Sequence, residues 1–145
     1  MRLEGPIVNS QCWIQVLTGD PARSLHGGRV QHHALTPVNA LIDTGATTSA
    51  VSIEFARQLG LVGRTSSKVS GVGGLHESQQ APALIGFQYD GSTFFRILPM
   101  LILPLGIPML LGMDDILAGT LHVDGPRGKW TWSISTGNVK NLGDA

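Results

Sequence analysis

The chain carries the segment Leu41-Ile42-Asp43-Thr44-Gly45-Ala46, in which two apolar residues run into an aspartate, followed at once by a hydroxyl residue and a glycine. This order predicts a strand that ends in a tight turn, because Leu41 and Ile42 suit a core and Gly45 permits a turn that a side chain would obstruct. The carboxylate of Asp43 would then stand at the end of a rigid element, where a catalytic acid can be held. The same residue types are ordinary turn formers, so the segment alone fits a strand ending in a polar turn equally well.

The bulk composition limits what the chain can be. With 145 residues it has the length of one domain with a real core, which we assign to residues 1–136, with residues 137–145 as a C-terminal tail. Ten acidic residues balance ten basic ones and no block of like charge occurs, so neither a nucleic acid nor an anionic membrane surface is an expected partner.

The cysteine count and the N-terminus bear on the compartment. Cys12 is the single cysteine, which excludes an internal disulfide and fits a reducing environment. The first residues include Arg2 and Glu4 and no apolar run, so no secretory signal is expected. We expect a cytoplasmic protein.

Local patterns predict a mostly-β domain, since glycines and prolines are scattered between short apolar runs. The expected strands cover residues 7–18, 29–35, 38–42, 48–51, 84–89, 93–98, 109–112, 120–123 and 130–134. Ser52 can cap a short helix over 53–59 that Gly60 ends, and Asp114 and Asp115 can start a second helix. Residues 69–75 have the composition of a glycine-rich hairpin tip, and Asp90-Gly91 is a strong hairpin-turn signal.

One apolar stretch, residues 97–111, could be mistaken for a membrane span. It is 15 residues long and is interrupted by three prolines, whereas a spanning helix needs roughly 20 apolar residues. Two buried strands joined by a Pro-Gly turn explain it better, and we expect no membrane segment in the chain.

Three segments occur in an informative order: residues 40–47 with Asp-Thr-Gly, the glycine-rich residues 71–74, and the apolar-apolar-glycine run at 109–112. This order resembles the retropepsin-like aspartic proteases, the family of the retroviral proteases and their cellular and bacterial relatives. The resemblance covers roughly residues 37–119. It implies a closed, barrel-like β subunit with one or two short helices that is active as a two-fold homodimer.

The resemblance also implies a mechanism. Aspartic proteolysis uses two carboxylates that share one proton, since like charges so close cannot both ionise. The sequence contains no second Asp-Thr-Gly or Asp-Ser-Gly, so a working site would take Asp43 from each of two chains, as a self-complementary two-fold interface allows. The implied activity is that of an aspartic endopeptidase acting on peptide or protein substrates.

The family pattern assigns roles to the neighbouring residues. Thr44 would bond across the dimer axis, and Gly45 would allow the substrate backbone to come close. The expected substrate-binding residues are Ala46 and Thr47, with Gly71, Val72, Gly73 and Gly74 as a flap. The expected supporting strand behind the loop that begins at Asp43 consists of Leu110, Leu111 and Gly112.

The chain departs from the retroviral pattern at two places. Thr47-Thr48 stands where an acidic residue is usual, and Met113 stands where an arginine is usual. The Gly-Met-Asp order looks more like the cellular and bacterial branch, and the missing arginine-carboxylate support predicts a weak dimer.

Other chemistries lack their residues. The chain has no spaced histidine pair, no second cysteine and no Gly-Lys-Ser/Thr after a glycine run, so neither a metal nor another cofactor is expected. The alternative to an enzyme is a non-catalytic dimeric module of the same fold that binds peptides or assembles a larger protein. The intact Asp43-Thr44-Gly45 favours the enzyme, because a binding module has no need of a carboxylate pair.

Overall fold

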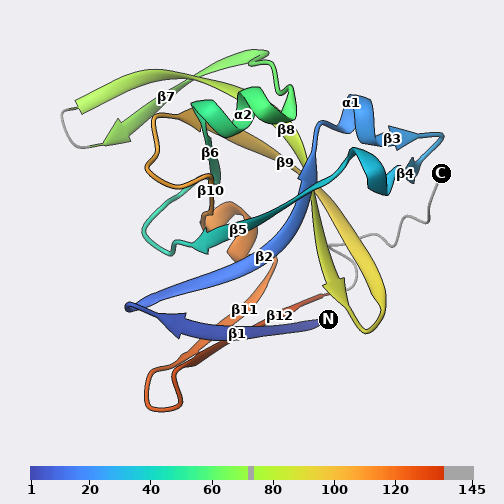
Figure 1. Ribbon diagram of the computed structural model, residues 1–145. Helices are drawn as coiled ribbons and strands as arrows, with labels where there is room; N and C mark the ends of the chain where they lie inside the picture. The colour runs from blue at the N-terminus through green and yellow to red at the C-terminus, as the bar shows by residue number, and fades with distance from the viewer. Residues whose placement is uncertain (72–73, 136–145) are drawn as a thin grey trace.

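The computed structural model describes residues 1–71 and 74–135 (Figure 1). Strands dominate, as expected from the sequence, and the helices are short. The strands are β1 (Arg2–Val8), β2 (Gln11–Gly19), β3 (Leu25–His26), β4 (Arg29–Val30), β5 (Thr36–Ile42), β6 (Ala50–Ser52), β7 (Thr65–Gly71), β8 (Gly74–Tyr89), β9 (Ser92–Leu103), β10 (Met109–Leu111), β11 (Gly119–Asp124) and β12 (Lys129–Ile134). The helices are α1 (Pro21–Ser24), the 3-10 helix η1 (His32–Ala34), α2 (Ile53–Leu59) and α3 (Met113–Ile116).

Six strands close into a barrel in the order β2-β5-β10-β6-β9-β8, because β8 pairs back onto β2. The sheet extends beyond this barrel through β1, β12 and β11 on one side and through β7 on the other. Figure 1 shows β1, β11 and β12 at the bottom of the view and the β7–β8 hairpin at the top. The expected barrel-like, mostly-β fold is confirmed.

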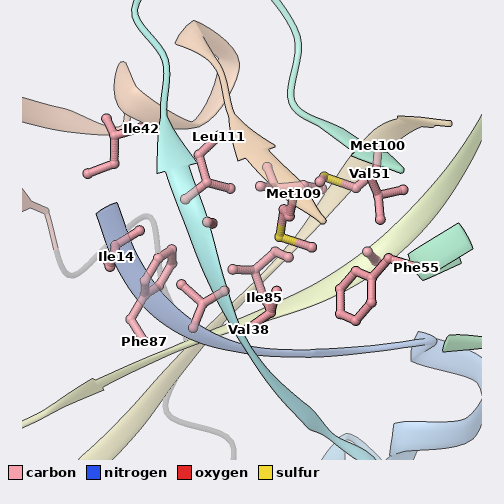
Figure 2. Packing of buried hydrophobic residues seen from close by; sticks show 14 of the residues in the cluster. Ile14, Val38, Ile42, Val51, Phe55, Ile85, Phe87, Met100, Met109 and Leu111 are labelled. Carbon is pink, nitrogen blue, oxygen red and sulfur yellow. The ribbon is translucent and has the colours of Figure 1, made fainter. Parts of the chain in front are cut away.

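The core fills the barrel with side chains that alternate along its strands. In β5, Val38, Ala40 and Ile42 are buried while Asn39 is exposed, which is the two-residue period of a strand with one face inward. Figure 2 shows Ile42 beside Leu111 of β10 within this cluster. The end of β5 therefore rests on packed apolar side chains.

Helix α2 forms where the sequence predicted it. The Ser52 hydroxyl accepts a hydrogen bond from the Phe55 N–H at 3.0 Å, and Gly60 ends the helix with a left-handed φ of 73°. The helix buries Phe55 and Leu59 against the barrel.

The N-terminal region differs from the expectation of one strand over 7–18. β1 ends at Val8 and β2 begins at Gln11, because Asn9 and Ser10 adopt φ values of 51° and 62° and turn the chain. β1 then pairs with β12 near the other end of the chain. Residues 1–6, in which no strand was expected, thus belong to the sheet.

The expected strand over 29–35 is wrong beyond Val30. The chain bends into η1, where the Leu35 N–H donates to the His32 carbonyl at 3.1 Å. Val30 is fully buried in a small second cluster with Leu84 and Phe95, so packing anchors the start of this segment while a turn takes its end away from the sheet.

The apolar stretch 97–111 forms the end of β9 and all of β10, as the two-strand interpretation predicted. In the part of the chain that the structure describes, no helix has the length and apolarity to cross a membrane. The expected tail, residues 137–145, and the flap residues Val72 and Gly73 lie outside the described residues.

Candidate active site

Asp43 is the first residue beyond β5, and β10 fixes its position. β5 and β10 pair in parallel, with Ile42 opposite Leu111. The Asp43 N–H donates to the Leu111 carbonyl at 2.9 Å. The backbone of Asp43 is thus held by the strand next to it, one residue after the buried Ile42.

The turn after Asp43 is closed by the carboxylate itself. The Gly45 N–H donates to Asp43 Oδ1 at 2.9 Å, and the Ala46 N–H donates to the Asp43 carbonyl at 3.2 Å. A Cβ atom at Gly45 would lie 3.2 Å from the same carboxylate oxygen, so a side chain there would crowd the aspartate. Asp43 is half-buried and Thr44 is exposed. One carboxylate oxygen is therefore oriented by the turn in a site that opens to solvent.

The first turn of α3 forms hydrogen bonds with Ala46 and Thr47, at the end of the turn that follows Asp43. The Met113 N–H donates to the Ala46 carbonyl at 2.8 Å, and the Asp114 N–H donates to the Thr47 carbonyl at 3.1 Å. The first N–H groups of a helix have no partner within the helix, and here they bind the loop that follows Asp43.

Gly112 is a glycine because the loop leaves no room for a side chain. A Cβ atom there would meet the Ala46 carbonyl oxygen at 2.8 Å and the Thr48 carbonyl oxygen at 2.9 Å. Leu111 is fully buried and Leu110 is half-buried. Leu111 and Gly112 thus lie against the loop of residues 43–49, which we call the Asp43 loop, whereas Leu110 pairs with Leu41 of β5. The expected strand ends one residue early, because Gly112 is already the N-cap of α3.

Two residues at this junction, Ser49 and Asp114, were not assigned to the site from the sequence, although Asp114 was expected to start a helix. The Ser49 hydroxyl donates to Asp114 Oδ1 at 2.7 Å and accepts the Gly112 N–H at 3.0 Å. The Ser49 N–H donates to the same Asp114 oxygen at 3.0 Å. Ser49 is fully buried, and its position directly before the apolar pair Ala50-Val51 was the available signal.

The neighbouring Asp115 faces the opposite way, into the molecule. It is fully buried and forms an ion pair with Arg96 of β9, whose guanidinium also donates to the Asp115 carbonyl at 3.3 Å. Burial raises the pKa of the Asp115 carboxyl to about 6, and the Arg96 charge opposes part of that rise. Trp132 Nε1 donates to the Ile116 carbonyl at 3.2 Å, so α3 is also fixed to β12.

The candidate flap is the hairpin of β7 and β8. These strands pair up to Gly71 opposite Gly74, and Val72 and Gly73 between them lie outside the described residues. At its base, Gln79 of β8 and Val51 of β6 both pair with Ile102 of β9. The hairpin is thus one strand away from β6, which begins just after the Asp43 loop.

A cavity of about 590 Å³ lies elsewhere, between β1, β2, β8 and β12, with Trp13 and Trp130 among its lining residues. Asp43 does not line it. Among the residues described, no group of three histidine, cysteine or acidic side chains could hold a metal ion.

Solved structures define the class of fold. The chain is similar to EIAV protease, solved in complex with the inhibitor HBY-793, at 24% identity and a TM-score of 0.53, over 80% of this chain and 96% of the other. It is also similar to a retropepsin-like aspartic protease from Rickettsia conorii, at 15% identity and a TM-score of 0.56, over 90% of this chain and 89% of the other. The fold is that of the retropepsin-like proteases.

The family follows from the sequence itself. A family model described as "Aspartyl protease" matches residues 27–114, which is more than half of the chain and includes Asp43 and Gly112. The protein belongs to this aspartyl protease family. No curated protein matches the chain.

Proposed function

We propose that the protein is an aspartic endopeptidase, with residues 1–136 as its protease domain, that works as a two-fold homodimer with Asp43 contributed by each subunit. The observation that carries this proposal is the setting of Asp43. Its backbone is bonded to Leu111 of β10, one carboxylate oxygen is bonded to the Gly45 N–H, and the site opens to solvent. The sequence supplies one Asp-Thr-Gly only, so the second carboxylate must come from a second copy.

In the proposed mechanism the two Asp43 carboxylates share one proton, because two negative charges at this separation repel. The ionised carboxylate takes a proton from a water molecule, and that water attacks the scissile carbonyl carbon. The protonated carboxyl donates a hydrogen bond to the carbonyl oxygen, on which negative charge develops. Collapse of the tetrahedral intermediate with proton transfer to the leaving nitrogen breaks the amide bond.

The proposed substrate is an extended peptide segment of a protein. In the dimer, Thr44 of each subunit would face the two-fold axis, which its exposure permits. Ala46 and Thr47 would line the floor of the cleft. The flap, formed by Gly71, Val72, Gly73 and Gly74, would cover the peptide and exclude water.

The test is cleavage of a peptide library at acidic pH by the wild type and by Asp43→Asn. We expect pepstatin-sensitive cleavage by the wild type and less than about 1% of that rate for the variant, since removal of a catalytic carboxylate costs several orders of magnitude. Asp90→Asn is the matched control, because Asp90 sits in the β8–β9 turn, and it should retain full activity.

Two outcomes would overturn the proposal. Residual activity of Asp43→Asn above a few per cent would remove this residue from the chemistry. A wild type that binds library peptides tightly but never cleaves them would instead support the non-catalytic peptide-binding module.

A further inference from the structure

We propose that Asp114 is a positioning residue for the site, whose carboxylate fixes Ser49 and through it the loop that carries Asp43. This inference rests on the proposed function, because it assigns a role in the same reaction. Asp114 acts through the backbone of the Asp43 loop, because its hydrogen bonds are made to Ser49 and Thr47.

Ser49 anchors the end of the Asp43 loop through its hydrogen bonds. Its N–H and its hydroxyl both donate to Asp114 Oδ1, at 3.0 and 2.7 Å. Its hydroxyl oxygen accepts the Gly112 N–H at 3.0 Å, and its carbonyl accepts the Leu101 N–H of β9 at 3.0 Å. All four polar functions of a fully buried residue are therefore satisfied, and two of them depend on one carboxylate oxygen.

Removing that oxygen would leave two donors of the buried Ser49 without their acceptor, which is costly. Ser49 would have to turn toward another acceptor, and the Gly112 N–H would lose its alignment with the Ser49 hydroxyl. The residue after Gly112, Met113, donates its N–H to the Ala46 carbonyl at 2.8 Å. A shift at Ser49 is therefore transmitted to Ala46, which closes the turn on the Asp43 carbonyl.

Asp114 reaches Ser49 within one subunit, so this support of the loop does not depend on the second copy. The same residue also binds the loop through its backbone, by its N–H to the Thr47 carbonyl at 3.1 Å.

The experiment compares Asp114→Ala, Asp114→Asn and Ser49→Ala in steady-state peptide cleavage. The asparagine side chain keeps an acceptor oxygen for both Ser49 donors, whereas alanine has none. We expect kcat to fall about 100-fold in Asp114→Ala, as small displacements of a catalytic group can do, with KM changed by less than about threefold. Asp114→Asn should keep kcat within about threefold of the wild type, and Ser49→Ala should lose about tenfold.

Asp124→Ala is the matched control, because Asp124 also accepts a backbone N–H, that of Arg127 at 3.2 Å, in an exposed turn. It should leave kcat and KM unchanged. An unchanged kcat in Asp114→Ala would overturn the proposal. So would an Asp114→Asn variant as impaired as the alanine variant, since charge rather than the acceptor would then be responsible.

Hydrogen exchange separates this inference from the function itself. In the unliganded protein the Ser49 and Gly112 amides should exchange at least tenfold faster in Asp114→Ala than in the wild type, and Asp114→Asn should retain the protection. If the wild type cleaves nothing and these amides still respond, the proposed function fails and the positioning of the loop stands. If the enzyme is active and the amides do not respond, the positioning role is wrong.

Discussion

At the scale of single residues, two adjacent aspartates attach α3 to two different parts of the molecule. Asp114 is exposed and bonds outward to the Asp43 loop, whereas Asp115 is fully buried and pairs with Arg96. The pKa of Asp115 is raised from its ordinary 3.8 to about 6 by burial. In the folded protein this group binds its proton more readily than in the unfolded chain.

The pKa of Asp115 leads to a prediction about stability and pH. Because the folded-state pKa is the higher one, the stabilisation from protonation is complete below pH 3.8 and is lost as the pH rises through about 6. Asp115→Asn cannot titrate, so the free energy of unfolding of the wild type minus that of the variant should rise by about 3 kcal/mol from pH 7 to pH 3.5. Urea unfolding at both pH values measures it. A difference that stays flat, or falls toward acid, contradicts the raised pKa.

At the scale of elements, α2 offers the simplest test of local structure. The Ser52 hydroxyl caps the Phe55 N–H and is itself buried. Ser52→Ala should lower the free energy of unfolding by about 1 kcal/mol, the usual cost of losing an N-cap. Ser133→Ala, at an exposed position in β12, is the control and should change stability by no more than a few tenths of a kcal/mol. Equal stability of the two variants in chemical unfolding would mean that the cap contributes nothing.

Elements with local signals were predictable, and those set by distant partners were not. Ser52 and Gly60 mark both ends of α2, and Asp90-Gly91 has the two positive φ values, 50° and 74°, that its hairpin turn requires. β8 was expected only from residue 84, and Pro82 just before it cannot donate to a strand ladder. Its pairing with β9 on one side and β7 on the other extends it back to Gly74.

The same distinction holds for the candidate site. The Asp43 turn is local, since Gly45 bonds to Asp43 two residues away, and its sequence pattern was informative. The bond from Ser49 to Asp114 joins residues 65 positions apart. No periodicity or spacing encodes such a contact, which exists because β10 inserts between β5 and β6. The Asp-Thr-Gly motif could therefore be recognised from the sequence, whereas the hydrogen bond between Ser49 and Asp114 that holds its loop could not.

At the scale of the whole molecule, the proposed site needs two copies of the chain. Far below the dissociation constant of the dimer, the dimer concentration falls with the square of the protein concentration. Tenfold dilution in that range should therefore lower the specific activity about tenfold, with sedimentation reporting the matching loss of dimer. An excess of Asp43→Asn subunits should inhibit the wild type by forming mixed dimers. A monomer that keeps full specific activity contradicts the two-chain site.

The insertion of β10 between β5 and β6 also has a consequence for biosynthesis. The Asp-Thr-Gly segment is translated well before its backbone anchor, the Leu111 carbonyl, and well before the α3 residues that bind its loop. Contacts between such distant segments form late in folding. A nascent or truncated chain that stops before Met109 should therefore carry the motif without the site. The proposed activity would then be delayed until β10 and α3 have been translated and have packed against the Asp43 loop.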